Sequence, residues 1–381
     1  MNPSSSLSHL NKIKKFFRYC KIFSFRRALT KTIGRSNVML PVFKKRYLFN
    51  KKHIFLIGCG QFQFSTIAYF LSQSFTNKFY GCYDIDTSKS KLLSYYYNIK
   101  FIPDKWESIL LEKNVNLIYI ASNHHSHAEY AIKCLNHNKD VYSEKPLVVE
   151  WLQYEVLFDL IDKSKNKFFA GYNRPFSKAI HTIKKQFQKY NQKSPTFTLN
   201  YYINGHAIPE DHWYRDPKEG TRVCGNIGHW IDLSIHILNW RTKLPRRLKI
   251  NISYSDIAEA DDNIVITMTT DVGDLINIAI TSRTEPFEGI SESINMQLGD
   301  IIARIDDFRS LNLWLGSNLI EEKYSQKDVG HKQAVLQPFK KNQQRSISEI
   351  KIGSYMMLYI KDMVMGRIDK AVVDLESLDT K

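Results

Sequence analysis

The strongest constraint on the fold of this chain is a pattern that recurs between residues 53 and 147. A short apolar segment ends on a glycine turn or a polar cluster, and a helical pattern follows. Such repeats predict parallel strands joined by helices, and the carboxyl ends of parallel strands share one edge of a sheet. Open α/β sheets bind their ligands at that edge, so the polar clusters are the first candidates for a functional site.

The first repeat reads HIFLIGCGQFQFSTIAYFLSQ and begins at residue 53. Gly58 permits a sharp turn, and Gly60 leaves room for a pyrophosphate to reach the backbone amides at the helix start. We therefore assign Gly58, Gly60, Gln61 and Phe62 to a dinucleotide site. The third small residue of the G-x-G-x-x-G pattern is replaced by Gln63, and a glycine turn by itself is weak evidence.

The second strand, residues 78–83, ends in Asp84. Asp84 lies 24 residues after Gly60, which is near the spacing at which an acidic side chain binds the adenosine ribose hydroxyls of NAD. A carboxylate there also repels the 2′-phosphate of NADP, so NAD is the expected cofactor. Alternatively Asp84 opens a turn or caps the next helix, although Asp86 suits that role better.

The third strand leads into a polar run that contains Ser122, Asn123, His124 and His127. Histidines on a strand-to-helix turn point in different directions, so no metal site is expected. We expect His127 to pack in the helix start, and Asn123 or His124 to border the nicotinamide.

The fourth segment, VYSEKPL at 141–147, ends on Glu144, Lys145 and Pro146. A Lys beside a Glu is usually a solvated pair at the end of an element. The preceding repeats favour another interpretation, in which Glu144 and Lys145 contribute to the cofactor site and Lys145 is also the polar centre of a dehydrogenase active site.

After residue 194 the composition changes to alternating apolar and polar segments separated by short turns, which predicts a mostly antiparallel sheet. The fold class is therefore an N-terminal Rossmann dinucleotide-binding domain followed by an α+β domain. The expected divisions are a basic, poorly ordered extension, the Rossmann domain, the α+β domain and a C-terminal helical segment, at residues 1–51, 52–172, 173–350 and 351–381.

Within the second domain, His229, Asp232 and His236 share one face of a predicted helix. His236 falls among apolar residues and is expected in the core, whereas His229 follows a glycine-rich approach that leaves room for a ligand. Arginines suit phosphate or carboxylate groups. The candidate substrate-binding residues are Asn173, Arg174, Trp213, Arg222, His229 and Asp232.

The formal charge of +16 is concentrated at the N-terminus. Residues 1–52 hold fourteen Lys or Arg and no Asp or Glu, which leaves +2 for the other 329 residues, so no nucleic-acid partner is expected for the folded part. Apolar residues recur at near-helical spacing in this basic stretch, so it could lie on an anionic membrane as an amphipathic helix. An organelle transit peptide and a poorly ordered extension are the alternatives, and the last is favoured.

Five scattered cysteines without C-x-x-C spacing point to a reducing compartment and predict a cytoplasmic protein. No apolar run approaches the roughly 18 to 20 residues that a membrane-spanning helix needs.

Several longer motifs resemble the family of glucose-fructose oxidoreductase, inositol dehydrogenase and MocA (Gfo/Idh/MocA) over about residues 52–350. Within that family, the chain looks most like the branch fused to zinc-type alcohol dehydrogenase domains in surface-polysaccharide gene sets. The motifs are SNHHSHA at 122–128, EKP at 144–146, GYNRPFS at 171–177, EDHWYRDPKEG at 210–220, GHWIDL at 228–233, DDFRSL at 306–311 and KDVGHK at 327–332.

The resemblance implies a sugar or nucleotide-sugar dehydrogenase in which Lys145 polarises the reacting hydroxyl and His229 is the general base, the two lying close in space. It also suggests a role in polysaccharide biosynthesis, and the predicted exposed sheet suits a homo-oligomer. Gly225 stands where family members commonly carry an Asp, and Gln63 departs from the glycine motif. These departures leave open an alternative, a catalytically impaired NAD-binding sensor or assembly partner of the same fold.

Overall fold

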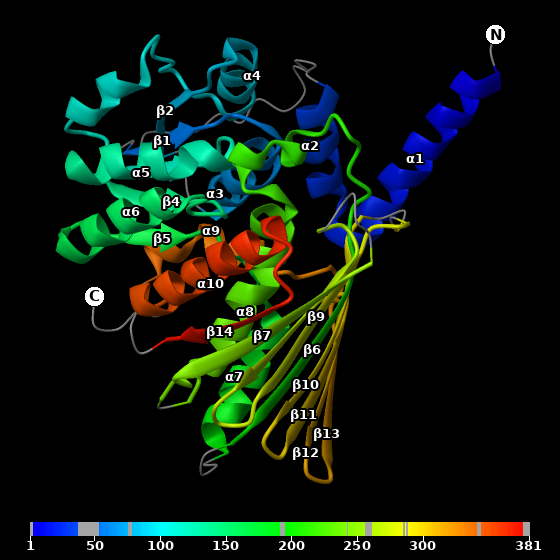
Figure 1. Ribbon diagram of the computed structural model, residues 1–381. Coiled ribbons are helices and arrows are strands. Elements are labelled where there is room, and N and C mark those ends of the chain that lie inside the picture. The colour runs from blue at the N-terminus through cyan, green and yellow to red at the C-terminus, as the bar shows by residue number, and fades with distance from the viewer. Residues whose placement is uncertain are drawn as a thin grey trace. The chain divides into compact units, whose positions relative to one another are not determined.

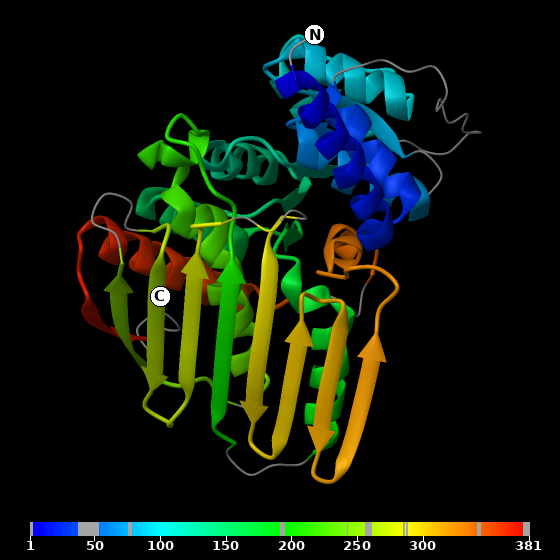
Figure 2. The same cartoon turned by 90° about the vertical axis from the view of Figure 1, so that its right-hand side faces the viewer.

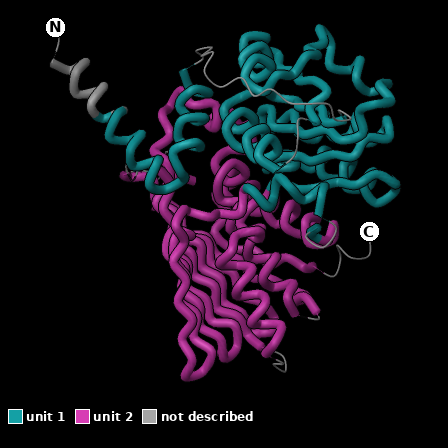
Figure 3. Tube along the Cα trace, turned by 180° about the vertical axis from the view of Figure 1, so that it is seen from behind, with its two compact units in different colours: residues 1–171, 332–345 teal, residues 172–331, 346–381 magenta. Residues whose placement is uncertain are grey.

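The chain divides into two compact units, which Figure 3 distinguishes by colour. Unit 1 comprises Met1–Gly171 and Lys332–Arg345, and unit 2 comprises Tyr172–His331 and Ser346–Lys381. The computed structural model describes residues 3–36, 53–74, 78–190, 195–241, 243–255, 261–284, 286, 289–340 and 344–375.

Unit 1 is built on a five-stranded parallel sheet with the strand order β2-β1-β3-β4-β5. Because β1 lies between β2 and β3, successive crossovers run in opposite directions from it, which creates the topological switch point of a doubly wound fold. The predicted Rossmann arrangement is thus confirmed. The strands are β1 (Ile54–Ile57), β2 (Phe79–Tyr83), β3 (Leu117–Ile120), β4 (Asp140–Ser143) and β5 (Phe168–Ala170).

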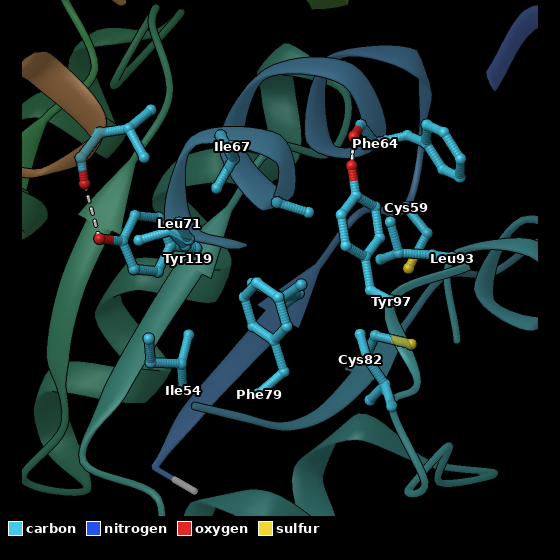
Figure 4. Packing of buried hydrophobic residues seen from close by; sticks show 14 of the residues in the cluster. Ile54, Cys59, Phe64, Ile67, Leu71, Phe79, Cys82, Leu93, Tyr97 and Tyr119 are labelled. Atoms are coloured by element: carbon cyan, nitrogen blue, oxygen red, sulfur yellow. Dashed lines mark hydrogen bonds between the residues drawn. The ribbon is translucent and has the colours of Figure 1, made fainter. Parts of the chain in front are cut away.

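One face of this sheet is covered by the helices that follow β1 and β2, and their apolar side chains form a continuous core (Figure 4). Phe64 and Tyr97 lie together there, and the Tyr97 hydroxyl donates to the Phe64 carbonyl at 2.6 Å. The helices α5 and α6 pack against each other, and α5 packs on β3 and β4 (Figure 1). The helices are α3 (Ala68–Ser74), α4 (Thr87–Tyr97), α5 (His127–Asn136) and α6 (Trp151–Lys163).

The N-terminal stretch forms two helices, α1 (Pro3–Phe23) and α2 (Phe25–Ser36). This corrects the expectation of a poorly ordered extension for residues 3–36. The reason is packing: Ile33 of α2 belongs to the core cluster of unit 1, and Gly34 lies so near Phe64 that an added Cβ would come within 2.8 Å of its ring. The rest of that predicted extension, residues 37–51, lies outside the described residues.

A late segment of the chain returns to unit 1. Val335, at the end of α9 (His331–Val335), and Leu336 join the core cluster, and the Tyr119 hydroxyl donates to the Val335 carbonyl at 2.7 Å. Gln337 donates from Nε2 to the Ala170 carbonyl at 2.9 Å. The segment therefore completes the core of unit 1, although it lies inside the range expected for the second domain.

Unit 2 is built on a nine-stranded sheet with the order β13-β12-β11-β10-β6-β9-β8-β7-β14. Apart from β6 and β9, which are parallel, its neighbours are antiparallel, as predicted. Burial alternates along the strands, so one face is apolar and buried. The strands are β6 (Phe197–Asn204), β7 (Arg247–Tyr254), β8 (Ile264–Thr270), β9 (Leu275–Thr281), β10 (Ser291–Leu298), β11 (Ile301–Asp306), β12 (Ser310–Leu315), β13 (Asn318–Lys323) and β14 (Lys370–Asp374).

The helices of unit 2 lie on the apolar face of this sheet, while the opposite face is uncovered by helices of the unit (Figure 2). They are α7 (Lys178–Lys189), α8 (Gly228–Leu238) and α10 (Ile347–Met365), and α8 packs against α10. The C-terminal segment expected to be helical is only partly so. Its helix ends at Met365, and β14 then pairs with β7 at the edge of the sheet.

Candidate active site

The polar clusters that follow the strands of unit 1 are aligned along one edge of the sheet. Hydrogen bonds between neighbouring strands continue to the residues that begin each following loop, so these loops start side by side. The bonds are Gly58 N to Tyr83 O, Ala121 N to Ile57 O and Glu144 N to Ile120 O, each 2.9 Å, and Gly171 N to Ser143 O, 2.7 Å.

The glycine turn after β1 has the properties that a dinucleotide site needs. Gly58 has φ +80°, and an added Cβ would lie 2.5 Å from the Ala121 carbonyl oxygen, so any larger residue would be both strained and obstructed. An added Cβ on Gly60 would meet nothing within 4 Å. The turn is thus closed toward β3 at the switch point and open at Gly60, where a pyrophosphate must approach the backbone.

Asp84 is fixed to this turn by its carboxylate. Oδ2 accepts a hydrogen bond from the Cys59 amide at 2.6 Å, and Oδ1 accepts one from the Asp86 amide at 2.9 Å. Each carboxylate oxygen has a further lone pair, so the half-buried group can also accept from ribose hydroxyls. Asp86 takes the capping role, since its Oδ1 accepts from the Ser88 amide at 3.0 Å at the start of α4.

Gln63 follows the turn as a fully buried amide. Neither its Oε1 nor its Nε2 has a hydrogen-bond partner among the described residues. It opens the π-helical turn η2 (Gln63–Ile67), in which the Ala68 amide reaches back to the Gln63 carbonyl. The helix is therefore widened where the small residue of the glycine motif is missing, and a polar group is buried at a cost.

The other two assigned residues of the turn, Gln61 and Phe62, have different surroundings. Gln61 donates from Nε2 to the Lys31 carbonyl of α2 at 3.1 Å, so its side chain is held by the N-terminal helices. Phe62 is partly buried and packs against the core cluster. Any contact of these residues with the cofactor would therefore come from their backbone amides at the helix start.

After β3, the four assigned residues divide into a buried and an accessible pair. His127 is buried at the start of α5, where Nδ1 lies 2.7 Å from the Pro146 carbonyl and Nε2 lies 3.0 Å from the Ser122 carbonyl. His127 thus connects the loop after β3 with the loop after β4. His124 is also buried, with its ring 6.0 Å from that of His127, whereas Asn123 is exposed and Ser122 is half-buried.

Glu144 is buried behind the fourth loop. The Tyr142 hydroxyl donates to its Oε1 at 2.9 Å, and Gly171 lies so close that an added Cβ would come within 2.8 Å of its Cδ. Burial raises the pKa of Glu144 from 4.5 to about 7, opposed by the Tyr142 hydrogen bond and the charge of Lys145. Tyr142 was not among the predicted site residues, although a Tyr two positions before Glu144 must share its face of the strand.

Lys145 is half-buried and stands at the carboxyl edge of the sheet, next to this carboxyl group. Its amide donates to Glu144 Oε2 at 3.4 Å, and the Lys145–Pro146 peptide bond is cis. Lys145 therefore lies just after the end of β4, at the predicted position. Among the parts of the chain that the structure describes, no group of three His, Cys, Asp or Glu side chains could hold a metal ion.

In unit 2, His229 is the second residue of α8 and the half-buried member of an otherwise buried helix. Its ring lies 6.1 Å from that of Tyr172, which is buried at the start of the unit. Asp232 is buried one turn later, and an added Cβ on Gly353 of α10 would lie 3.4 Å from its Oδ1. His236 is a core histidine, as expected, with Nδ1 2.8 Å from Glu349 Oε1.

The side chains of Arg174 and Asn173 bind other residues within unit 2. Arg174 is buried and binds Glu292 through Nε at 2.7 Å and Nη2 at 2.8 Å, and the Trp230 indole donates to the same carboxylate at 2.8 Å. Glu292 is itself desolvated, yet Arg174 holds its pKa below the ordinary value. Asn173 donates to the Val329 carbonyl at 2.5 Å. Both residues were expected to hold substrate, and these internal contacts speak against that role.

Arg222 is also used internally. It is 1% exposed, binds Asp262 Oδ1 through Nη1 at 2.5 Å, and donates from Nη2 to the His206 carbonyl. Trp213, in contrast, is 41% exposed and begins the 3₁₀ helix η6 (Trp213–Arg215) of the same unit. Arg222 was also expected to hold substrate, and these internal contacts do not support that role.

Lys145 belongs to unit 1 and His229 to unit 2. Their expected proximity consequently stays a prediction.

Comparisons with known proteins agree with this geometry. Residues 52–172 match the model of the GFO_IDH_MocA oxidoreductase family, described as having an NAD-binding Rossmann fold. Inositol 2-dehydrogenase from Salmonella typhimurium is 24% identical over 135 residues, which cover 35% of this chain and 38% of that protein. The matched segment therefore spans well under half of that relative.

Solved structures extend the likeness to both units. An oxidoreductase domain protein from Kribbella flavida has a TM-score of 0.70 at 14% identity, covering 86% of this chain and 99% of its own. GenD2 from gentamicin A biosynthesis, solved in complex with NAD, has a TM-score of 0.68 at 12% identity, covering 87% of this chain and 98% of its own. At these identities the structural likeness establishes the fold, while the family model supports the Gfo/Idh/MocA resemblance for the Rossmann segment.

Proposed function

We propose that this protein is an NAD-dependent oxidoreductase that transfers hydride between the nicotinamide and a CH–OH group of a sugar or nucleotide-sugar. The observation that supports the proposal is the contact between Asp84 and the Cys59 amide, which fixes the carboxylate that we expect to bind ribose to an open glycine turn. The ammonium-bearing Lys145 follows another strand of the same parallel sheet.

The residues present fit a dinucleotide. Backbone amides beyond Gly60 would bind the pyrophosphate, and Asp84 would accept hydrogen bonds from the adenosine ribose. A carboxylate at that position favours NAD over NADP, whose 2′-phosphate it would repel. Ser122, Asn123 and His124 would border the nicotinamide. When bound, NAD supplies the hydride acceptor at C4 of its nicotinamide.

Lys145 is proposed to donate a hydrogen bond to the reacting hydroxyl and to stabilise the negative charge that develops on its oxygen. His229 is proposed to accept the hydroxyl proton, a role that suits an imidazole near neutral pH. The buried Glu144 is proposed to act on Lys145 as a positioning residue, because it stands next to it in the chain and its charge state sets the local field.

Exposed Trp213 and buried Asp232 are retained as candidates for holding the substrate. Arg174, Arg222 and Asn173 are left out because their polar groups bind within unit 2. The motifs at 210–220 and 228–233 support a substrate of the sugar class, a role in surface-polysaccharide biosynthesis and kinship with the branch fused to zinc-type alcohol dehydrogenases. All three are proposals.

The test compares Lys145→Ala with Lys113→Ala, a matched control at an exposed position. Binding of NAD is measured by calorimetry, and turnover is followed by the absorbance of reduced cofactor across a panel of nucleotide-sugars and inositols. We expect Lys145→Ala to bind NAD normally and to lose at least a hundredfold in turnover. Normal turnover in Lys145→Ala would refute the assignment of Lys145, and failure of the wild type to bind NAD would refute the cofactor assignment.

One observation favours a second candidate, an NAD-binding sensor or assembly partner without dehydrogenase activity. Gly225, in the buried turn η8 (Val223–Ile227), offers no side chain where family members commonly carry an Asp. The resemblance places that Asp four residues before the general base. In this case NAD would bind, but no member of the sugar panel would reduce it.

Two wider expectations belong to the same proposal. The uncovered face of the nine-stranded sheet, which exposes Tyr202 and Ile302, would suit a homo-oligomer, and light scattering of the purified chain would test this. Location in the cytoplasm rests on the five cysteines, which are all free thiols in the structure. None of the helices described is long and apolar enough to cross a membrane.

A further inference from the structure

The N-terminal helices α1 and α2 pack against each other, joined by a turn at Ser24 with φ +85°. We call this pair the helical hairpin, residues 3–36. Tyr19 and Ile22 of α1 are buried, and the Lys31 ammonium of α2 lies 4.4 Å from the centre of the Tyr19 ring. The hairpin therefore has a defined internal packing of aromatic rings and cations.

The hairpin is fixed to unit 1 through α2. Ala28 and Ile33 are buried, and Gly34 allows close approach to Phe64 on the helix after the glycine turn. The Gln61 side chain donates to the Lys31 carbonyl at 3.1 Å. A ligand or partner that binds the hairpin would thus be bound to the same unit as the proposed cofactor.

A groove of about 590 Å³ lies between the two helices. Its lining includes the apolar residues Ile13, Phe16, Tyr19 and Ala28 and the cationic residues Lys15, Lys31 and Arg35. This volume falls within the range of ligand pockets, roughly 300–1,000 Å³. A ligand for it needs an apolar part and an anionic part.

At the groove and beside it, the hairpin exposes large apolar side chains to solvent. Ile13 is 54% exposed, Phe17 is 62% exposed and Phe25 is 60% exposed. Ile13 and Phe17 lie one turn apart on α1, and exposed Lys14 and Arg18 follow them in sequence. Residues 3–36 contain nine Lys or Arg and no Asp or Glu, so no acidic side chain of the hairpin reduces its charge.

We propose that the helical hairpin binds the surface of bilayers that contain anionic phospholipid. Ile13 and Phe17 enter the boundary between headgroups and acyl chains, the groove receives one acyl chain, and its cations contact lipid phosphate. Apolar side chains next to Lys and Arg are the combination that interfacial helices use. A nucleic acid would satisfy the cations, but its sugar-phosphate backbone would leave the aliphatic Ile13 and the apolar groove exposed.

The experiment uses the full chain and vesicles of phosphatidylcholine, alone or mixed with phosphatidylglycerol, with binding measured by flotation. Three double variants are compared: Ile13→Ser with Phe17→Ser, Lys15→Gln with Arg35→Gln, and a matched control, Leu111→Ser with Lys113→Gln. The control residues are exposed and lie outside the hairpin, with Leu111 81% exposed. Circular dichroism and NAD binding check that each variant is folded.

We expect the wild type and the control to bind the mixed vesicles and not the phosphatidylcholine vesicles, and to be released by salt. The serine variant should bind at least tenfold more weakly, because two apolar side chains no longer enter the lipid. The glutamine variant should lose roughly fivefold for each charge removed. NAD binding should be the same in all four proteins, which separates this proposal from the dehydrogenase assignment.

Three results would overturn the proposal: no binding of the wild type to mixed vesicles, equal binding by the serine variant and the control, or displacement of the protein from vesicles by glycerol phosphate alone. The last would mean that a free phosphate, and not a bilayer, occupies the site. Retention on DNA with no retention on lipid would identify a nucleic acid as the partner and would likewise contradict the proposal.

Discussion

Glu144 should make the stability of the protein depend on pH between its ordinary pKa and its pKa in the fold. Burial raises that pKa from 4.5 to about 7. In this interval the folded chain binds a proton that the unfolded chain has lost, so the free energy of unfolding falls as pH rises. The stability that the protonated Glu144 contributes is fully present below pH 4.5 and is lost above pH 7. At roughly 1.4 kcal/mol per pH unit, this loss amounts to about 3 kcal/mol of the free energy of unfolding.

The perturbation is Glu144→Gln, which keeps an oxygen that can accept from the Tyr142 hydroxyl but cannot ionise. Urea unfolding, followed by tryptophan fluorescence, gives the free energy of unfolding of both proteins from about pH 5 to about pH 8. As the pH rises through this range, we expect the free energy of unfolding of the variant to increase relative to that of the wild type by about 2 to 3 kcal/mol. Glu107→Gln, at an exposed position, is the matched control.

A constant difference between Glu144→Gln and the wild type at all pH values would show that Glu144 has the same charge in both states. A difference that grows toward acid would mean that the carboxylate is stabilised in the fold, with Lys145 outweighing the effect of burial. Either result would refute the reasoning.

The remaining predictions concern three other side chains. Asp84→Asn should lower the preference for NAD over NADP at least tenfold, because like-charge repulsion of the 2′-phosphate is lost; titration with both cofactors checks this, and an unchanged ratio would contradict it. Gln63→Met should raise the free energy of unfolding by about 1–3 kcal/mol, since an unpartnered buried amide is removed, and a fall would reveal a hidden partner. Arg174→Ala should lower the free energy of unfolding by about 3–5 kcal/mol, because Glu292 is left buried without its counter-ion. A loss of substrate affinity without destabilisation would instead support a role of Arg174 in substrate binding.

The fold of both units could be predicted largely from local patterns. The apolar strands of unit 1 and the alternating strands of unit 2 can be recognised in the sequence from segments of a few residues. Gly58, Asp84 and Lys145 each follow the end of a strand, and because the parallel strands are in register, these residues indicate the functional edge of the sheet. Asp86 as a helix cap and His236 as a core residue were also foreseeable, because their immediate neighbours in sequence determine their surroundings.

Contacts between residues that lie far apart in sequence could not be predicted. Arg174 looked like an anion-binding residue, and only the fold reveals Glu292, 118 residues later, as its partner. Arg222 finds Asp262 in the same way, 40 residues later. The packing of Ile33 and Gly34 against unit 1 was equally hidden, because a helix that is basic on one side has the same sequence signature whether its apolar side meets a core, a membrane or solvent.

The return of residues 332–345 to unit 1 has a consequence for how the protein is made. Val335 and Leu336 are part of the core of unit 1, but a ribosome adds them about 160 residues after Gly171. At about 5 to 20 residues per second, the first unit waits roughly 8 to 30 s for its last core residues. During this interval its incomplete core offers apolar surface to chaperones, and a fragment that stops at residue 171 would carry the same defect permanently.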